Sequence, residues 1–163
     1  MHEFIFSQFK SFYILPKLKG MKGILLSINI SERRGTRKKP VKEANITMEG
    51  IEGDSHAGRW HRQISLLGEE SIEKMRGKGI EINYGDFAEN LTVGGITLYK
   101  LNIGTRIRVG EAILEVTQIG KKCHEDCEIK KIVGKCVMPT EGIFARVIKK
   151  GKIRVGDEVE VIE

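Results

Sequence analysis

Short runs of branched aliphatic residues, separated by glycines, dominate the chain from residue 23 onward. Branched side chains fit a pleated, half-buried surface, so these runs predict β-strands. The segments TRIRVG and EVEVI also alternate polar and apolar residues, which indicates strands with one buried face. The expected strands span residues 23–30, 63–67, 91–97, 106–109, 113–119, 143–148 and 158–162.

One segment, GEESIEKMRGKG at residues 68–79, has the pattern of a short helix instead. Glu69 and Glu70 lie in its first turn, Ile72 and Met75 share one face, and the glycines near its end can stop it. The chain holds 19 glycines in all, which suits a barrel with many tight turns. The pattern therefore predicts a mostly β fold with one clear helix.

The first twenty residues, MHEFIFSQFKSFYILPKLKG, differ from the rest, because they hold four of the six phenylalanines. A signal peptide needs a basic start and an uninterrupted apolar centre, but Glu3, Gln8 and Lys10 break this pattern. We expect residues 1–21 to be an extension outside the core and residues 22–163 to form one domain. The alternative is an apolar arm that docks on the body of the protein or on a second subunit.

Composition narrows the class of partner. The chain has 163 residues, of which 40% are hydrophobic and 31% charged, and no apolar run is long enough to predict a membrane span. The formal net charge of +6 favours anionic partners: phosphorylated cofactors, acidic proteins or nucleic acid. An aromatic content of 6%, without alternation of basic and aromatic residues, argues against nucleic acid.

Five cations fall in the segment SERRGTRKKPV at residues 31–41, which we interpret as a basic loop within the domain. Its side chains either remain solvated or form an electrostatic rim for a phosphate-bearing ligand. No recognition helix or aromatic platform accompanies it, which again argues against DNA or RNA. The five cations are Arg33, Arg34, Arg37, Lys38 and Lys39.

All three cysteines lie in one segment, TQIGKKCHEDCEIKKIVGKC at residues 117–136. Cysteines in an odd number and in one segment favour a reducing compartment over a disulfide framework. A structural zinc site needs four ligands, commonly as two short-spaced pairs. Cys123, Cys127 and Cys136, with His124 as a fourth ligand, lack any CxxC pair, so we expect no zinc.

A single reactive thiolate is the alternative use of this segment. Cys123 follows Lys121 and Lys122, whose charges would lower the pKa of the thiol. The acidic residues just after it, Glu125 and Asp126 among them, would oppose that effect.

Two further segments carry polar side chains suited to a ligand. In GIEGDSHAGRWHRQISLL at residues 50–67, a glycine-flanked turn with Asp54 and His56 precedes Arg62 and Gln63, which suits an anionic heterocycle. The alternative is a turn in which Asp54 and His56 bond the backbone.

In YGDFAENLTVGG at residues 84–95, two carboxylates three residues apart, Asp86 and Glu89, can act as acid and base or hold a metal. The alternative there is a polar turn before a strand.

Taken together and in this order, five segments resemble the MOSC domain, the module found at the C-terminus of molybdenum cofactor sulfurases and in small stand-alone proteins. The resemblance covers about residues 22–163 and implies a mostly β fold, a distorted β-barrel like that of pyruvate kinase, with a few short helices. The segments are GIEGDSH at 50–56, RQISLL at 62–67, YGDFAENL at 84–91, IGTRIRVGEAILEVTQIGKKC at 103–123 and EGIFARVIKKGKIRVGDEV at 141–159.

The resemblance also implies a link to the molybdenum cofactor (molybdopterin), a phosphorylated pterin dithiolene. Cys123 ends the pattern TQxGxxC, and the matching cysteine of relatives either ligates molybdenum or is proposed to carry sulfur. Both roles need a soft, deprotonated sulfur that faces a cleft. As a sulfur carrier, Cys123 would hold a persulfide.

Nine further residues fall in matching motifs and are expected to line the same cleft. Arg62, Arg146 and the basic loop would neutralise phosphate, while Asn90 and Gln118 would bond the amide edges of the pterin. Asp86 and Asn90 have the alternative role of closing the turn before the strand at 91–97. The nine residues are His56, Arg62, Gln63, Asp86, Glu89, Asn90, Thr117, Gln118 and Arg146.

Cys127 and Cys136 are additional thiols that would resolve a persulfide on Cys123 as a disulfide, complete a metal site or simply pack. The sequence shows no cysteine desulfurase domain, so we expect a cysteine desulfurase or a molybdoenzyme as protein partner. Pyridoxal phosphate is associated with the family only.

The function expected from these observations is cofactor binding by a cytoplasmic protein, with sulfur accepted or carried on Cys123. One alternative is a non-catalytic carrier or chaperone of the cofactor. The other is a molybdenum-dependent reductase of N-hydroxylated compounds, with Cys123 as metal ligand.

Overall fold

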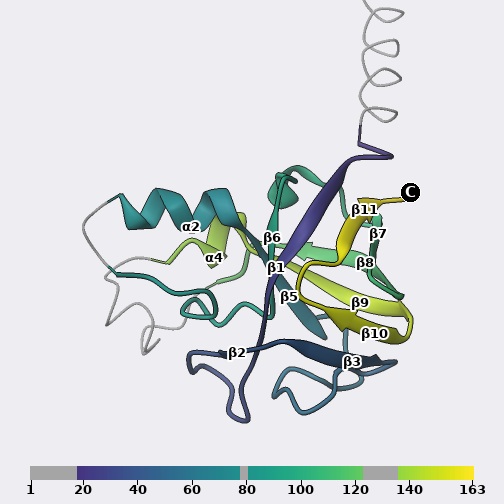
Figure 1. The fold of residues 1–163 in the computed structure, drawn as a ribbon, viewed down its shortest axis with the longest axis horizontal. Helices are drawn as coiled ribbons and strands as arrows, with labels where there is room; N and C mark the ends of the chain where they lie inside the picture. Colours follow the sequence, from purple (N-terminus) through teal and green to yellow (C-terminus); the bar gives the residue numbers. More distant parts are fainter. Residues whose placement is uncertain (1–17, 78–80, 123–135) are drawn as a thin grey trace, which may run out of the picture.

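The structure is a computed structural model that describes residues 18–77, 81–122 and 136–163. Seven strands close into a barrel, because β1 pairs with both β6 and β11 (Figure 1). The pair β5–β6 is parallel, and the other barrel pairs are antiparallel. In order around the barrel, the strands are β1 (Lys22–Ile30), β11 (Glu158–Val161), β7 (Arg106–Val109), β8 (Ala112–Ile119), β9 (Ile143–Lys149), β5 (Ile64–Gly68) and β6 (Leu91–Gly94).

The barrel is distorted, as expected. The strand register shifts between Leu25 and Ser27 where β1 meets β6, and it shifts twice between β8 and β9. Such irregularities increase the local twist and allow a short-stranded sheet to close. The mostly β fold predicted from the sequence is therefore confirmed.

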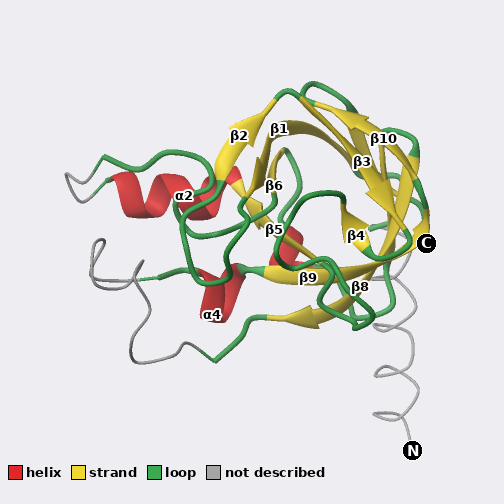
Figure 2. Cartoon of the chain, turned by 90° about the horizontal axis from the view of Figure 1, so that it is seen from below, coloured by secondary structure: helices red, strands yellow, loops and turns green. Residues whose placement is uncertain are grey.

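The remaining elements cover the sides of the barrel. The edge strand β2 (Lys39–Val41) pairs with the last residues of β1. A separate sheet of β3 (Glu43–Thr47), β4 (Gly50–Ile51) and β10 (Gly151–Arg154) lies along one side of the barrel (Figure 2). The helices α2 (Glu69–Arg76) and α4 (Met138–Glu141) lie together on another side, and the 3-10 helix η2 (Leu98–Lys100) follows β6.

Helix α2 matches the helix predicted from the sequence. Its acidic first turn and basic last turn complement the partial charges at the two helix ends. Ile72 and Met75 are buried in a cluster that also contains Phe87, Met138 and Phe144. This cluster is separate from the core inside the barrel, which consists mainly of Ile, Leu and Val side chains.

The strands predicted from aliphatic runs are all present, most with ends within two residues of those expected. The exception is the run at 91–97, where β6 ends at Gly94. The strands β2, β3, β4 and β10 are not predicted by that pattern, because β4 has only two residues and the other three are short and carry mostly polar or exposed residues. One of them, β2, lies inside the segment interpreted as a basic loop, so that segment ends in a strand.

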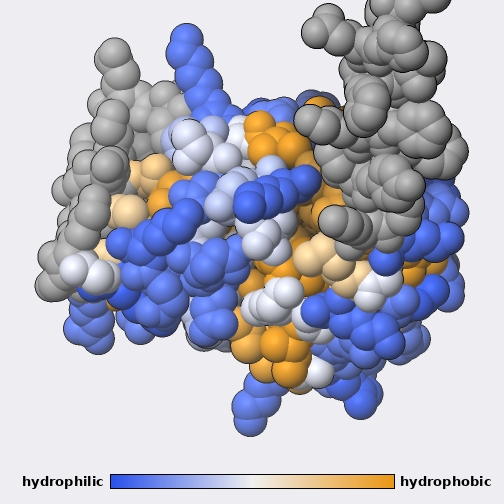
Figure 3. Space-filling view, turned by 90° about the horizontal axis from the view of Figure 1, so that it is seen from above, coloured by the Kyte–Doolittle hydropathy of each residue, from blue (hydrophilic) through white to orange (hydrophobic). Residues whose placement is uncertain are grey.

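The first strand begins at Lys22, one residue after the expected extension. Before it, the Gly20 N–H donates to the Val161 carbonyl at 2.7 Å, and Leu18 and Met21 pack against the barrel core. Within the described residues, no helix is long and apolar enough to cross a membrane. The face seen from above carries mainly hydrophilic side chains around a strip of hydrophobic ones (Figure 3).

A buried asparagine ties three barrel strands together. Asn90 Oδ1 accepts hydrogen bonds from the Ser65 N–H at 3.0 Å and the Ser65 hydroxyl at 3.2 Å. Its Nδ2 donates to the Asn29 carbonyl at 3.1 Å. All three side chains are almost fully buried, so none of these polar groups can be satisfied by solvent instead. Asn90 thus connects β1, β5 and the start of β6.

We predict that Asn90→Ala strongly destabilises the fold, because it leaves a buried N–H of Ser65 and a buried carbonyl of Asn29 without partners. The expected loss in the free energy of unfolding is about 3 kcal/mol, measured by urea denaturation. Asn102→Ala, at an exposed position, is the matched control and should change stability little. Equal stability of the two variants would contradict this role of Asn90.

Candidate functional site

A buried ion pair joins the basic loop to the turn that follows β4. Lys38 Nζ donates to Asp54 Oδ1 at 2.8 Å and to the Ser31 hydroxyl at 3.1 Å. The two charged side chains are 1% and 0% exposed. The Lys38 N–H donates to the Gly85 carbonyl at 2.9 Å, and a side chain at Gly85 would clash with the Lys38 carbonyl. Lys38 therefore fixes three loops at once.

The surroundings shift the pKa of both partners. Burial lowers the pKa of the Lys38 ammonium, and the hydrogen bond and charge of Asp54 oppose that shift. Burial would raise the pKa of Asp54, but the hydrogen bond and charge of Lys38 outweigh it and hold the pKa below its usual value. The Ser31 and His56 N–H groups also donate to Asp54, so both oxygens of the carboxylate are engaged within a rigid turn.

His56 lies directly on this ion pair. Its N–H donates to Asp54 Oδ2 at 3.0 Å, but its ring Nδ1 is 3.8 Å from the same oxygen, which is too long for a hydrogen bond. This Nδ1 is buried and has no hydrogen-bond partner among the residues that the structure describes. Burial lowers the pKa of His56 to about 4, and the charges of Lys38, Lys121 and Arg34 contribute in the same direction. The imidazole is therefore neutral at neutral pH.

Trp60, the single tryptophan of the chain, lies next to this histidine and contacts two arginines. The guanidinium carbons of Arg34 and Arg62 lie 4.9 and 4.7 Å from the centroid of the Trp60 ring. The His56 ring lies parallel to the indole, with centroids 6.3 Å apart. Within the described part of the chain, no carboxylate forms an ion pair with either guanidinium. Most of their N–H groups therefore remain available for an anion.

The end of β8 is attached to the same cluster. The Thr117 hydroxyl donates to the His61 carbonyl at 2.7 Å, and Gln118 Nε2 donates to the Gly120 carbonyl at 2.8 Å. Gly120 has a φ of 72°, and a side chain there would clash with the Pro139 carbonyl. The charge of the next residue, Lys121, lowers the pKa of both Lys38 and His56. The chain that leads to Cys123 thus approaches His56, although Cys123 itself lies outside the described residues.

Two other residues expected in the cleft interact with the protein itself: Gln63 through hydrogen bonds and Arg146 through an ion pair. Gln63 Nε2 donates to the carbonyls of Met48 and Gly58, both at 2.9 Å, and its Oε1 accepts from the Val147 N–H at 2.7 Å. Arg146 projects from the outside of β9 and pairs with Glu115 at 3.2 Å. In this structure Gln63 holds the turn that contains Gly58 in place, and Arg146 belongs to the charged outer surface of the barrel.

Asp86 and Glu89 lie in a turn beside Lys38 but differ in exposure. Asp86 accepts from the Asn83 N–H at 2.8 Å and lines a hollow of about 540 Å³ with Tyr84 and Arg37. Glu89 is fully buried, accepts from the Phe87 N–H at 3.2 Å and from a threonine hydroxyl on β6 at 3.3 Å. Burial raises the pKa of Glu89 to about 7. Asn90 connects three barrel strands, as described above, and both the oxygen and the nitrogen of its amide form hydrogen bonds.

His56 and Arg62 are therefore brought together around Trp60, and Thr117 is hydrogen-bonded to the adjacent His61. Gln118 follows Thr117 on β8, while Asn90 and Glu89 are fully buried. Sequence reasoning missed Trp60, and it named Lys38 only as one cation of the basic loop, without its burial or its pairing with Asp54. The sequence carried a signal for Trp60, because it is the single tryptophan and stands in the motif between two candidate residues. It carried none for Lys38.

The described residues contain no group of three or more His, Cys, Asp or Glu side chains that could hold a metal ion. The zinc alternative was weighed for Cys123, His124, Cys127 and Cys136, and all of these except Cys136 lie outside the described ranges.

We predict that Glu89→Gln stabilises the protein by an amount that grows as the pH rises from about 4.5 to about 7. The pKa of folded Glu89 is raised above the ordinary 4.5, so its contribution to stability is present below that pH and lost as the pH rises through about 7. The glutamine amide keeps an acceptor for the Phe87 N–H without the charge. We expect a gain of about 2 kcal/mol near pH 8 and none near pH 4.5, measured by urea denaturation. The exposed Glu111→Gln is the control, and a pH-independent gain in Glu89→Gln would contradict the prediction.

We predict that Lys38→Met raises the pKa of His56 from about 4 toward its ordinary 6.5. The variant removes one nearby positive charge and leaves the carboxylate of Asp54 unpaired, and both changes favour a protonated imidazole. An NMR titration of the His56 ring measures the shift. Lys39→Met removes the same charge from an exposed position and should leave the pKa near 4; an equal shift in both variants would contradict the role of Lys38.

Comparison with known proteins places this geometry in a family. YflK, an uncharacterized protein of Bacillus subtilis, is 28% identical over 142 residues, which span 78% of this chain and 63% of YflK. The chain thus covers less than two thirds of that relative's length. Two solved structures share the fold. YuaD from Bacillus subtilis is 22% identical with a TM-score of 0.74 over 88% of this chain and 97% of YuaD. YiiM from Geobacillus stearothermophilus is 20% identical with a TM-score of 0.68 over 86% of this chain and 75% of YiiM.

A family model for the MOSC domain matches residues 53–160, more than half of the chain. The matched region begins at the turn that carries Asp54 and His56 and includes the strand that leads to Cys123. The chain belongs to the MOSC domain family.

Proposed function

We propose that this protein binds the molybdenum cofactor at the Trp60 cluster and carries sulfur for it on Cys123. The Trp60 cluster consists of Trp60 and the three side chains around its ring, Arg34, His56 and Arg62. The observation that supports this most directly is the neutral, buried His56 beside Arg34 and Arg62, two cations without carboxylate partners among the described residues. A site that keeps a histidine neutral among positive charges suits a ligand that brings negative charge and a ring N–H of its own.

The described residues fit a phosphorylated pterin. Arg34 and Arg62 would bind the phosphate, because guanidinium forks match phosphate oxygens and no acid competes for them among the described residues. Because Nδ1 is buried and faces Asp54, His56 would accept a hydrogen bond from the edge of the pterin through its other ring nitrogen. Lys38 and Lys121 would add positive potential without direct contact, Lys38 because it is buried. The bound group supplies metal and dithiolene chemistry, while the chain binds and orients it.

Cys123 stands two residues beyond Lys121, whose charge already acts on His56. The same field would favour the thiolate form, which is the form that attacks a persulfide. The thiolate would take the outer sulfur of a donor persulfide, so that the donor leaves as a thiolate and Cys123 holds the new sulfur–sulfur bond. A reducing compartment such as the cytoplasm keeps the acceptor available as a thiol, and a cysteine desulfurase is the expected donor.

Cys136 has a different setting. It is half-buried and packs against the cluster of α2, α4 and Phe87. We assign it a packing role, which makes it a control for Cys123.

We predict that the protein isolated from a cofactor-producing host contains pterin, and that incubation with a cysteine desulfurase and cysteine adds one sulfur atom to Cys123. Intact-protein and peptide mass spectrometry detect the sulfur adduct, and fluorescence of the oxidised pterin together with metal analysis detects the cofactor. Cys123→Ser should lose the adduct, and Arg34→Ala with Arg62→Ala should lose most of the pterin.

Cys136→Ser is the matched control and should keep both. Cofactor that survives Cys123→Ser, with no sulfur adduct on the wild-type protein, would contradict the sulfur role and favour a carrier. Loss of molybdenum in Cys123→Ser without any adduct on the wild type would favour a reductase with Cys123 as ligand. Absence of pterin from the wild-type protein would overturn the proposal.

A further inference from the structure

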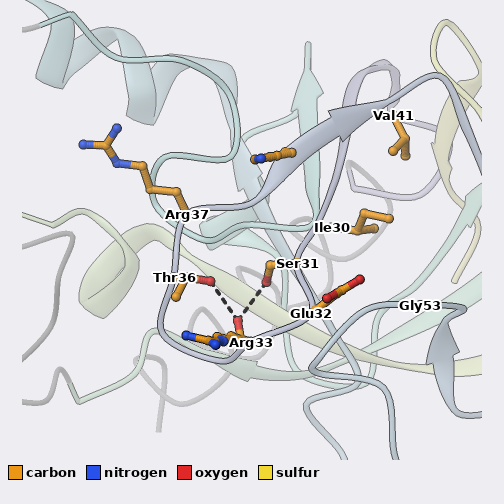
Figure 4. Close-up of a pocket in the computed structure, with 9 residues that line it drawn as sticks. Ile30, Ser31, Glu32, Arg33, Thr36, Arg37, Val41 and Gly53 are labelled. Carbon is orange, nitrogen blue, oxygen red and sulfur yellow. Dashed lines mark hydrogen bonds between the residues drawn. The ribbon is translucent and has the colours of Figure 1, made fainter.

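The basic loop borders a hollow on the surface of the protein. The hollow has a volume of about 800 Å³ and is lined by residues of β1, the basic loop, β2 and a neighbouring turn (Figure 4). Ile30 and Val41, both half-buried against the barrel core, supply its apolar part. Half-buried apolar side chains next to exposed charged ones are the combination found in protein–protein interfaces. The exposed cations that line the hollow are Arg33, Arg37 and Lys39.

These three cations form no ion pair within the part of the chain that the structure describes. On the barrel wall and on β10, by contrast, cations pair with acids of neighbouring strands, for example Arg108 with Glu160 and Lys152 with Glu43. Unpaired charges of one sign repel each other, and acidic groups of a partner would relieve that repulsion. The surface around the hollow is therefore complementary to an acidic one.

The loop that carries these cations has a defined shape. The Ser31 hydroxyl and the Thr36 hydroxyl both donate to the Arg33 carbonyl, at 3.0 and 2.9 Å (Figure 4). Lys38, between two cations that line the hollow, is buried in its ion pair with Asp54. A loop held at both points positions its exposed cations before a partner arrives, which reduces the entropy cost of binding.

A single small anion fits this surface less well than a protein does. The side chains of Arg33 and Arg37 extend in different directions and do not point toward one another, so they do not converge on one point (Figure 4). Glu32 also lines the hollow, and its charge would repel a bare anion placed there. A protein surface can present separate acids to the two arginines and an N–H donor to Glu32.

Addition of an extended peptide to the edge of β2 is disfavoured as well. This strand lies at the end of the strand order, but Pro40 in its centre has no N–H to donate. The Lys38 N–H, just before the strand, already donates to the Gly85 carbonyl. Recognition at this surface therefore proceeds through side chains.

The same loop reaches the Trp60 cluster. Arg34 follows Arg33 in the chain, its Nε donates to the Ser55 carbonyl at 3.2 Å, and its guanidinium lies over Trp60. The charge of Lys121 acts on Lys38 within the loop, so the described chain that leads toward Cys123 approaches the loop too. A protein bound to the exposed side of the loop would stand next to the proposed cofactor site.

We propose that the hollow and its cations form a docking surface for an acidic face of the sulfur-donor protein. Acids of the donor pair with the three cations, and one apolar side chain of the donor packs on Ile30 and Val41. The inference rests on the proposed function, because it names the surface through which a cysteine desulfurase would reach Cys123. The docking surface consists of Ile30, Arg33, Arg37, Lys39 and Val41.

The test compares two sulfur donors on the full chain, with the adduct on Cys123 measured by mass spectrometry. One donor is a cysteine desulfurase charged with cysteine, and the other is cysteine persulfide, which is small enough to need no docking surface. Arg33→Glu with Arg37→Glu should slow transfer from the desulfurase about tenfold and transfer from cysteine persulfide less than about twofold. Equal slowing with both donors would contradict the proposal.

Lys149→Glu with Lys150→Glu is the matched control, because it makes the same change of charge at exposed positions that do not line the hollow. It should change transfer from the desulfurase less than about twofold. In the wild type and in this control, that rate should fall as salt rises from about 0.05 to about 0.5 M, while the Arg33/Arg37 variant should respond little. Equal effects of the two double variants would reduce the result to net charge and overturn the docking surface.

Direct binding of the desulfurase, measured by fluorescence anisotropy, separates this inference from the proposed function. The Arg33/Arg37 variant should bind about tenfold more weakly than the wild type. Val41→Thr, which keeps the shape of the side chain but adds a hydroxyl, should bind about threefold more weakly; unchanged affinity would remove the apolar contact from the proposal.

Weakened binding in the Arg33/Arg37 variant, with no adduct on the wild type from either donor, would sink the proposed function and retain the docking surface. An adduct on the wild type from both donors, without measurable binding of the desulfurase, would overturn the docking surface and leave the proposed function standing. Tighter binding of a single-stranded oligonucleotide of about 20 bases, lost in the same variant, would assign the surface to nucleic acid instead.

Discussion

The buried ion pair between Lys38 and Asp54 is the interaction on which the site depends. Two charges at 2.8 Å, both almost fully buried, are tolerated because each has further hydrogen bonds: Lys38 to Ser31, and Asp54 from the N–H groups of Ser31 and His56. Removing either partner would leave an uncompensated charge in the interior. The pair therefore fixes the basic loop relative to the turn of His56 in one arrangement.

The positively charged side chains of the protein fall into two groups, those with an acidic partner and those without. On the barrel wall, cross-strand acids neutralise arginines and lysines, as Glu115 does for both Arg106 and Arg146. Around the basic loop and Trp60, five cations have no ion-pair partner within the described chain: Arg33, Arg34, Arg37, Lys39 and Arg62. These unpaired side chains concentrate positive charge around the basic loop and Trp60. Burial, together with these positive charges, keeps His56 neutral, and the charges would attract an anion to the same place.

The barrel and the helix α2 are predictable because aliphatic periodicity reports which face of an element is buried. The site is only partly predictable, since burial of a polar side chain depends on partners distant in sequence. Arg37, Lys38 and Lys39 form one uniform basic run in the sequence, yet Lys38 is buried and its neighbours line hollows. What distinguishes Lys38 is Asp54, sixteen residues away, which a local pattern does not connect to it.

The motifs that mark the family contain residues that hold the fold together as well as residues suited to ligand binding. Gln63 and Asn90 stand in matching segments, but their amides hold a turn and three strands together in this structure. His56 stands in another such segment and retains an unpartnered ring nitrogen among the described residues. A residue whose polar atoms all bond within the protein supports this fold whatever the chain binds. Motif resemblance therefore predicts the fold more strongly than the chemistry, and the chemistry is better sought where buried polar atoms or charged groups remain without partners.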